Sequence, residues 1–180
     1  MVVIPLSNDL VLRPPTDSDA PNYVELIADS DLHEFIPVLR SDYSEEHAQG
    51  WIDHCRKIEA TSGHPSTFVI CEASGHFIGQ IGLDDFERTG QETAEIGYWL
   101  GRPYRERGIM SAALPAFLEY AFRTLRVGKI CARTLASNRA SQRLLHRCQF
   151  TRTSDSDDNS ILFYELDVRA SGGGESDAIR

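Results

Sequence analysis

Residues 94–111 decide the fold, and they read Ala94-Glu95-Ile96-Gly97-Tyr98-Trp99-Leu100-Gly101-Arg102-Pro103-Tyr104-Arg105-Glu106-Arg107-Gly108-Ile109-Met110-Ser111. A β-rich run enters a turn with three arginines and a glycine, and a helix is predicted to begin there. A helix N-terminus presents unpaired backbone N–H groups, which suit a phosphate, and Gly108 lets the backbone approach such a ligand closely. The alternative is an ordinary strand–helix turn with solvated arginines. The chain contains neither Gly-x-x-x-x-Gly-Lys-Ser/Thr nor Gly-x-Gly-x-x-Gly, which argues against a P-loop or a Rossmann dinucleotide site.

Outward from this stretch, hydrophobic periodicity and turn residues predict strands and helices in alternating groups. On the helix that begins after Thr16, the side chains of Tyr23, Val24, Ile27 and Ala28 are expected to face inward. The element order predicts an α/β (α+β) fold with a mixed sheet and helices on both faces. We expect a single domain over residues 1–170 and a disordered Gly-rich tail over 171–180. The predicted strands are 10–13, 68–71, 77–83, 93–100, 129–134 and 161–166, and the predicted helices are 16–28, 31–35, 44–60, 108–124 and 138–147.

The charge is unevenly distributed along the 180 residues. The formal net charge is −9, but residues 1–100 carry −13, residues 101–152 carry +9 and residues 153–180 carry −5. No apolar run approaches the roughly 18 residues of a membrane span, and the N-terminus lacks the pattern of a secretory signal. The cysteines are Cys55, Cys71, Cys131 and Cys148, and their spacing fits neither a zinc site nor a CxxC motif. We therefore expect no metal, reduced thiols and a cytoplasmic protein.

A second polar stretch runs from Asn138 to Phe150. Taken alone, it is a basic helix in which Asn138 and Ser141 could simply be capping residues. Taken together, Arg105-x-x-Gly108 and the later Asn138-x-x-Ser141 resemble the GNAT superfamily of acyl-CoA-dependent N-acyltransferases. The RimJ/RimL-type branch, which includes ribosomal-protein N-terminal acetyltransferases, is indicated by 95–100, 138–141 and 12–19. The resemblance covers about residues 8–167.

This resemblance implies a mostly antiparallel, twisted sheet in which the strand at 94–101 splays from the strand at 129–135. Acetyl-CoA is the implied cosubstrate, with its pantetheine arm in the gap. Two positions depart from the family pattern: Met110 replaces a small residue, and Gln149 replaces a glycine before Phe150. Asn138 is expected to bind the pantetheine amide and Ser141 to contact the cofactor. The other implied CoA-binding residues are Trp99, Leu100, Gly101, Arg105, Glu106, Arg107, Gly108, Ile109, Met110 and Ser111.

The resemblance also implies two catalytic residues. Glu95 matches a family position for a general base that deprotonates the acceptor amine, because an amine with a pKa near 10 is mostly charged at neutral pH. The alternative is that Glu95 only binds or orients the substrate. Ser141 is the candidate to hydrogen-bond the CoA sulfur, since Leu145 stands where many members carry a tyrosine. On the substrate side we expect residues 33–35, His33, Glu34 and Phe35, with His33 as a second candidate base.

The implied function is acetyl transfer to a primary amine, either a protein N-terminal α-amine or a small molecule. The acidic segments 16–60 and 153–167 would favour a cationic acceptor by long-range attraction, although surplus carboxylates also simply aid solubility. The alternative function is a non-catalytic acyl-CoA-binding module. We expect no nucleic-acid binding, because the chain is acidic overall and no recognised motif accompanies the basic segment. We expect no membrane partner, because no apolar run is long enough for a membrane span. A homodimer is left open.

Overall fold

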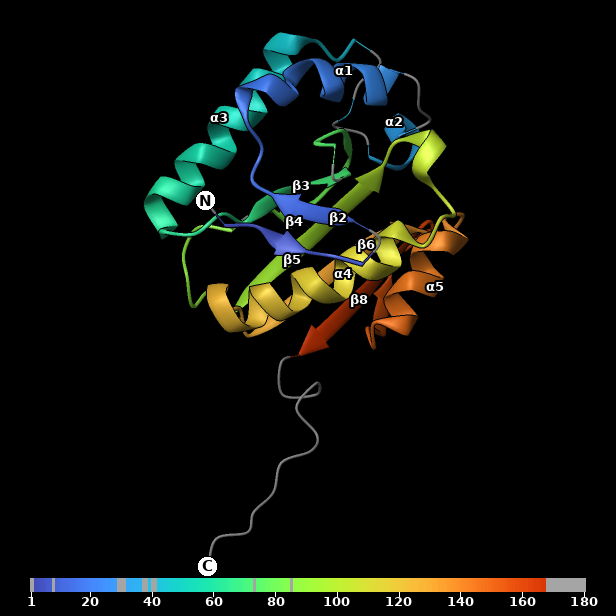
Figure 1. Ribbon diagram of the computed structural model, residues 1–180. Coiled ribbons are helices and arrows are strands. Elements are labelled where there is room, and N and C mark those ends of the chain that lie inside the picture. Colours follow the sequence, from blue (N-terminus) through green and yellow to red (C-terminus); the bar gives the residue numbers. More distant parts are fainter. Residues whose placement is uncertain are drawn as a thin grey trace, which may run out of the picture.

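A computed structural model describes residues 2–7, 9–28, 32–36, 39, 42–72, 74–84 and 86–167 (Figure 1). Its centre is an eight-stranded sheet in the order β1-β2-β3-β4-β5-β6-β8-β7. Neighbouring strands pair antiparallel except β5 and β6, which pair parallel. The strands are β1 (Ile4–Pro5), β2 (Leu10–Arg13), β3 (Thr67–Glu72), β4 (Phe77–Asp84), β5 (Thr93–Leu100), β6 (Lys129–Leu135), β7 (Thr151–Asp155) and β8 (Ile161–Asp167).

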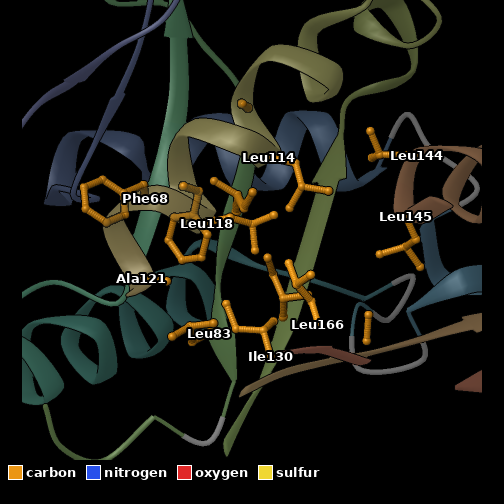
Figure 2. Packing of buried hydrophobic residues seen from close by; sticks show 14 of the residues in the cluster. Phe68, Leu83, Leu114, Leu118, Ala121, Ile130, Leu144, Leu145 and Leu166 are labelled. Carbon is orange, nitrogen blue, oxygen red and sulfur yellow. The ribbon is translucent and has the colours of Figure 1, made fainter. Parts of the chain in front are cut away.

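Helices cover both faces of the sheet, which confirms the predicted fold class. The helices α1 and α3 pack on one face against Val69, Phe77 and Trp99. The helices α4 and α5 pack on the other face, where Figure 2 shows Leu114 and Leu118 of α4 beside the sheet residues. The helices are α1 (Ala20–Ala28), α2 (Leu32–Phe35), α3 (Glu45–Ser62), α4 (Ile109–Tyr120) and α5 (Arg139–Arg147). A π-helical turn at Ala121–Leu125 continues α4, and 3-10 turns precede α1 at Asp17–Asp19 and α4 at Arg102–Tyr104.

Polar residues fix where the first helices begin. Thr16 and Asp19 form a capping box ahead of α1, and Ser44 caps α3 by accepting a hydrogen bond from the His47 N–H. Helix α3 ends at Ser62, two residues later than predicted, and its C-cap is Gly63, whose φ of 81° lies in the left-handed region that glycine tolerates best. The predicted starts of these two helices, at Thr16 and Ser44, are therefore confirmed.

The inward face of α1 and two additional strands differ from the sequence predictions. On α1, Leu26 is buried while Val24 is only partly buried and Ala28 is exposed, so the inward face is shifted by part of a turn. The strands β1 and β7 were not predicted; every residue of β7 is exposed, so no hydrophobic alternation marks it. The expected domain end at residue 170 and the expected tail at 171–180 lie outside the described residues.

The parallel pair β5–β6 is short, although both strands are long. Its register joins Thr93 to Lys129 and ends with Glu95 opposite Cys131. Strand β5 continues to Leu100 along β4, while β6 continues to Leu135 along β8. The two strands therefore part beyond Glu95, as the predicted splay requires.

Candidate functional site

Among the described residues, the parting of β5 and β6 leaves backbone groups of β5 without a neighbouring strand on that side. The Gly101 N–H donates a hydrogen bond to the Ile78 carbonyl at 3.0 Å. Because backbone groups alternate in direction along a strand, every second residue counted back from Gly101, beginning with Trp99, also directs its backbone N–H and carbonyl toward β4. The backbone groups of Ile96, Tyr98 and Leu100 then face the gap. This edge is a row of hydrogen-bonding groups that an extended chain with amides could pair with.

This alternation corrects part of the predicted cofactor edge. Trp99 and Gly101 were expected to offer backbone groups to the gap, but theirs are directed toward β4. The Trp99 side chain is buried beside Tyr23 and Phe77 under α1. Leu100 does face the gap, although its carbonyl already accepts a hydrogen bond from Arg105 Nε at 3.1 Å. Of the three residues, only Leu100 can present a free backbone donor there.

The turn before α4 has the geometry expected of an anion site. Gly108 is the N-cap of α4 with φ of 76°, and the first intrahelical hydrogen bond runs from the Ala112 N–H to the Gly108 carbonyl. The N–H groups of 109–111 therefore have no acceptor within the helix. The side chain of Met110, the residue that departs from the family pattern, packs against the main core, so the backbone donors remain accessible.

The side chains around this turn are partly tied to neighbouring elements. Arg105 is bonded to β5, and Arg107 lies over the Tyr104 ring with 5.7 Å to its centroid. The Ser111 hydroxyl accepts a hydrogen bond from Arg147 of α5 at 3.2 Å. Glu106 is exposed with a φ of 60°, a left-handed position in the turn. The predicted residues 105–111 therefore form one continuous turn at the head of α4.

At the other side of the gap, Asn138 and Ser141 lie together at the start of α5. The Asn138 Oδ1 accepts a hydrogen bond from the Ser141 N–H at 3.0 Å, so Asn138 does cap the helix. The Ser141 Oγ lies 2.8 Å from the Tyr98 hydroxyl of β5. Burial raises the pKa of Tyr98 to about 12, against the opposing effect of the Ser141 hydrogen bond, so this phenol stays protonated at neutral pH.

Glu95 lies on the opposite face of β5. Ala94 and Ile96 belong to the core beneath α4 and α5, so alternation directs the Glu95 side chain to the α1 and α3 face. Its carboxylate pairs with the Arg133 guanidinium of β6 at 2.7 Å, and 28% of the Glu95 side chain is exposed. Glu95 and Ser141 thus flank the gap from opposite sides of the sheet.

The residues predicted on the substrate side belong to α2, which is separate in the chain from β5, β6 and α5. His33 and Glu34 are exposed and Phe35 is partly buried. Their role stays a prediction. Within the described ranges, no three His, Cys, Asp or Glu side chains gather as metal ligands would, and no helix has the length and hydropathy to cross a membrane.

Two site residues escaped the sequence reasoning. Tyr98 was quoted only as part of a motif, and Arg133 was not considered. Side-chain alternation along β5 would have placed Tyr98 on the opposite face from Glu95, the face covered by α4 and α5. For Arg133 the only signal was its place on the strand expected opposite Glu95.

Comparison with known proteins gives a consistent result. The model of the acetyltransferase (GNAT) domain matches residues 9–151. The probable N-acetyltransferase YjcK of Bacillus subtilis is 30% identical over 82 residues, 46% of this chain and 45% of the relative. The putative ribosomal N-acetyltransferase YdaF of the same organism is 27% identical over 100 residues, 51% of this chain and 54% of the relative. The matched region thus spans about half the length of these curated relatives.

Solved structures share the fold over nearly the whole chain. RimL, the ribosomal L7/L12 alpha-N-protein acetyltransferase, in complex with coenzyme A, has a TM-score of 0.80 at 22% identity, covering 94% of this chain and 99% of that one. RimJ of Mycobacterium smegmatis in complex with CoA-disulfide has a TM-score of 0.75 at 24% identity, covering 94% and 88%. At these identities the likeness establishes the fold.

Proposed function

Because this chain belongs to the GNAT acetyltransferase family, we propose that it transfers an acetyl group from acetyl-CoA directly to a primary amine. The observation that carries this proposal is the gap between β5 and β6, whose pairing stops at Glu95 and Cys131 while both strands continue. An extended pantetheine arm with two amides fits such an edge, since the amides replace the missing strand partner.

The head of α4 supports the placement of the CoA pyrophosphate. The unpaired N–H groups of 109–111 and the positive end of the helix dipole favour an anion there. Arg102 and Arg107 add exposed positive charge to the turn. On the α5 side, the Asn138 side-chain oxygen is occupied by the cap, so its amide nitrogen is the group left to bind the pantetheine.

Proton acceptance from the amine and stabilisation of the leaving sulfur are assigned to opposite faces of the sheet. We assign Glu95 to accept a proton from the acceptor amine, directly or through water, as the amine attacks the thioester carbonyl. Ser141 hydrogen-bonds the sulfur as the C–S bond breaks and negative charge develops on it. Because these groups flank the gap from opposite faces, the nucleophile and the leaving group need not compete for the same space.

The proposed acceptor is a primary amine, either a protein N-terminal α-amine or a small-molecule amine. RimL, a structural neighbour, is named for acetylating the N-terminus of ribosomal L7/L12, which supports the first. The acidic segments 16–60 and 153–167 favour a cationic acceptor in either case. All four cysteines are unpaired, which fits a reducing, cytoplasmic location.

A thiol-release assay with acetyl-CoA tests the proposal. A panel of peptides with free N-termini, amino acids, polyamines and other amines should contain at least one acceptor that releases CoA thiol. Glu95→Gln and Ser141→Ala should each lower kcat at least tenfold in folded protein. The matched control is Glu119→Gln, which removes an exposed carboxylate of α4 that is paired with Arg123.

Three outcomes separate the alternatives. CoA binding without thiol release for any amine would instead indicate a non-catalytic acyl-CoA-binding module. Normal turnover by both site variants would refute the assigned roles. A thermal-shift comparison of acetyl-CoA with succinyl-CoA should show the larger stabilisation with acetyl-CoA; the reverse order would indicate a larger natural acyl group.

A further inference from the structure

The hydroxyl pair between β5 and α5 joins two elements that no sheet pairing connects. Tyr98 lies three residues beyond the last β5–β6 pair, and Ser141 lies in the first turn of α5. The 2.8 Å contact between the Tyr98 oxygen and Ser141 Oγ therefore spans the side of the gap opposite Glu95. Ser141 is held twice, through its backbone by the Asn138 cap and through its side chain by Tyr98.

The chemistry of the two hydroxyls favours Tyr98 as the donor of this hydrogen bond. A phenol, with an ordinary pKa of about 10, is a stronger acid than an aliphatic alcohol and is the better donor. A serine oxygen has one hydrogen to donate and two lone pairs with which to accept. When the Tyr98 O–H occupies one lone pair, the Ser141 hydrogen is directed away from Tyr98 and is free to donate elsewhere.

We infer that Tyr98 is a positioning residue for acyl transfer: its O–H donates to Ser141 Oγ and thereby aims the Ser141 hydrogen at the CoA sulfur. This inference rests on the proposed function, which brings the thioester sulfur to Ser141. Burial raises the pKa of Tyr98 to about 12, so the phenol remains a donor throughout the pH range in which an acetyltransferase would be assayed.

No net proton leaves Tyr98 in this scheme. The C–N bond forms as the C–S bond breaks, and the sulfur leaves with the bonding pair as a thiolate. The surplus ammonium proton passes to Glu95 and then to solvent, and the thiolate later takes a proton from solvent. The Tyr98–Ser141 pair stabilises the sulfur charge in between, because a hydrogen bond to a charged form favours that form.

The ionisation of bound CoA tests the inference without requiring turnover. The thiolate is titrated by its ultraviolet absorbance, as the difference between complexes of each variant with CoA and with desulfo-CoA, so that protein cysteines and tyrosines cancel. In Tyr98→Phe, which keeps the ring, the thiolate fraction at a given pH should fall about tenfold from wild type. Ser141→Ala and the double variant should show the same fall. Tyr120→Phe is the matched control, because it removes a hydroxyl bonded to the Pro65 carbonyl, and it should titrate like wild type.

The kinetics provide a second readout. Tyr98→Phe should lower kcat about tenfold with the KM for acetyl-CoA within twofold, and adding it to Ser141→Ala should have no further effect. A rise in KM without a change in kcat, effects that multiply in the double variant, or a wild-type thiol titration in Tyr98→Phe would overturn the positioning role alone. A wild-type thiol titration in Ser141→Ala would overturn the role assigned to Ser141 and the positioning role of Tyr98 that depends on it. Failure of the wild-type protein to bind CoA would overturn the proposed function and this inference with it.

Discussion

The end of α5 contains a backbone strain whose removal should stabilise the protein. Gln149 follows the C-cap with φ of 65°, its N–H donates to the His146 carbonyl, and the Phe150 N–H donates to the Leu145 carbonyl, each at 3.0 Å. These are the two hydrogen bonds of a Schellman motif, in which glycine is the preferred residue at the left-handed position. The Gln149 side chain is exposed, so its loss removes little packing.

The magnitude follows from two opposing contributions. A left-handed conformation costs a non-glycine residue roughly 1–2 kcal/mol, while glycine loses roughly 0.5–1 kcal/mol more backbone entropy on folding. Gln149→Gly should therefore raise the free energy of unfolding by about 0.5–1 kcal/mol, which for a chain of this length is about 1–4 °C in Tm.

Urea denaturation monitored by circular dichroism measures this change through the midpoint at an unchanged m value. Gln149→Ala is the control, because it shortens the side chain and keeps the strained φ, and it should lie within about 0.5 kcal/mol of wild type. The reasoning would be refuted if the glycine variant were no more stable than wild type, or if alanine stabilised as much as glycine. The KM for acetyl-CoA should not change, since the substitution is at the end of α5 opposite Ser141.

Two further predictions concern the framework around the site. Burial opposes ionisation of Asp19, but hydrogen bonds from Arg13 and from residue 16 outweigh it and hold the pKa of Asp19 below its ordinary value. The ionised carboxylate therefore stabilises the folded protein fully above the unfolded-state pKa, and this stabilisation is lost as the pH falls through the folded-state pKa. Asp19→Asn should cost about 3 kcal/mol at neutral pH and flatten the fall in stability below about pH 4, and urea midpoints measured across pH that fell as steeply as in wild type would contradict this. A Cβ at Gly79 would lie 2.4 Å from the Trp99 carbonyl oxygen, so Gly79→Ala should cost about 2–3 kcal/mol. Gly50→Ala, on an exposed position of α3 where a Cβ meets nothing within 4 Å, should instead stabilise by about 0.5–1 kcal/mol, and equal urea midpoints for the two variants would count against the argument.

The sequence predicted elements with a clear hydrophobic period well and missed elements without one. The bounds predicted for β5, 93–100, agree with the structure because apolar and polar residues alternate there between two covered faces. Strand β7 carries the polar residues Thr-Arg-Thr-Ser-Asp and is a strand only because it pairs with β8. Its conformation depends on a partner, and no local pattern records that.

In the site, too, the sequence predicted local contacts but not contacts that depend on how separate elements pack. The closeness of Asn138 and Ser141 follows from helical spacing, so it was available from the sequence. The contact of Tyr98 with Ser141 depends on how α5 docks against β5, which spacing does not determine. Side-chain alternation along β5 can be read from the sequence, but the edge toward which each backbone group points depends on the register with β4. That is why Trp99 and Gly101 were assigned to the gap and Leu100 is the one that faces it.

The basic segment 101–152 has a narrower meaning in the structure than its net charge suggested. Several of its cations are paired with carboxylates away from the α4 turn: Arg123 with Glu119, Lys129 with Glu165, Arg133 with Glu95 and Arg152 with Asp155. The positive charge available to a CoA phosphate is therefore concentrated in the turn at 102–107 and on α5, where Arg143 and Arg147 are exposed. A local arrangement of charge, rather than the net value of the segment, supports the binding of an anion by this acidic chain.

Within the proposed function, the protonation of the cysteines favours direct transfer of the acyl group to the amine over an intermediate on a cysteine. A covalent acyl intermediate on a cysteine needs a thiolate, and burial raises the pKa of Cys55 to about 12 and of Cys71 to about 11. Cys131 lies opposite Glu95 at the mouth of the gap, but burial and then the Glu165 carboxylate raise its pKa, and burial likewise raises that of Cys148. A thiol that stays protonated is a weak nucleophile, whereas the proposed site already places Glu95 on the amine side of the thioester and Ser141 on the sulfur side. Direct attack therefore needs no group that this chain lacks, and Cys131→Ser should retain wild-type kcat.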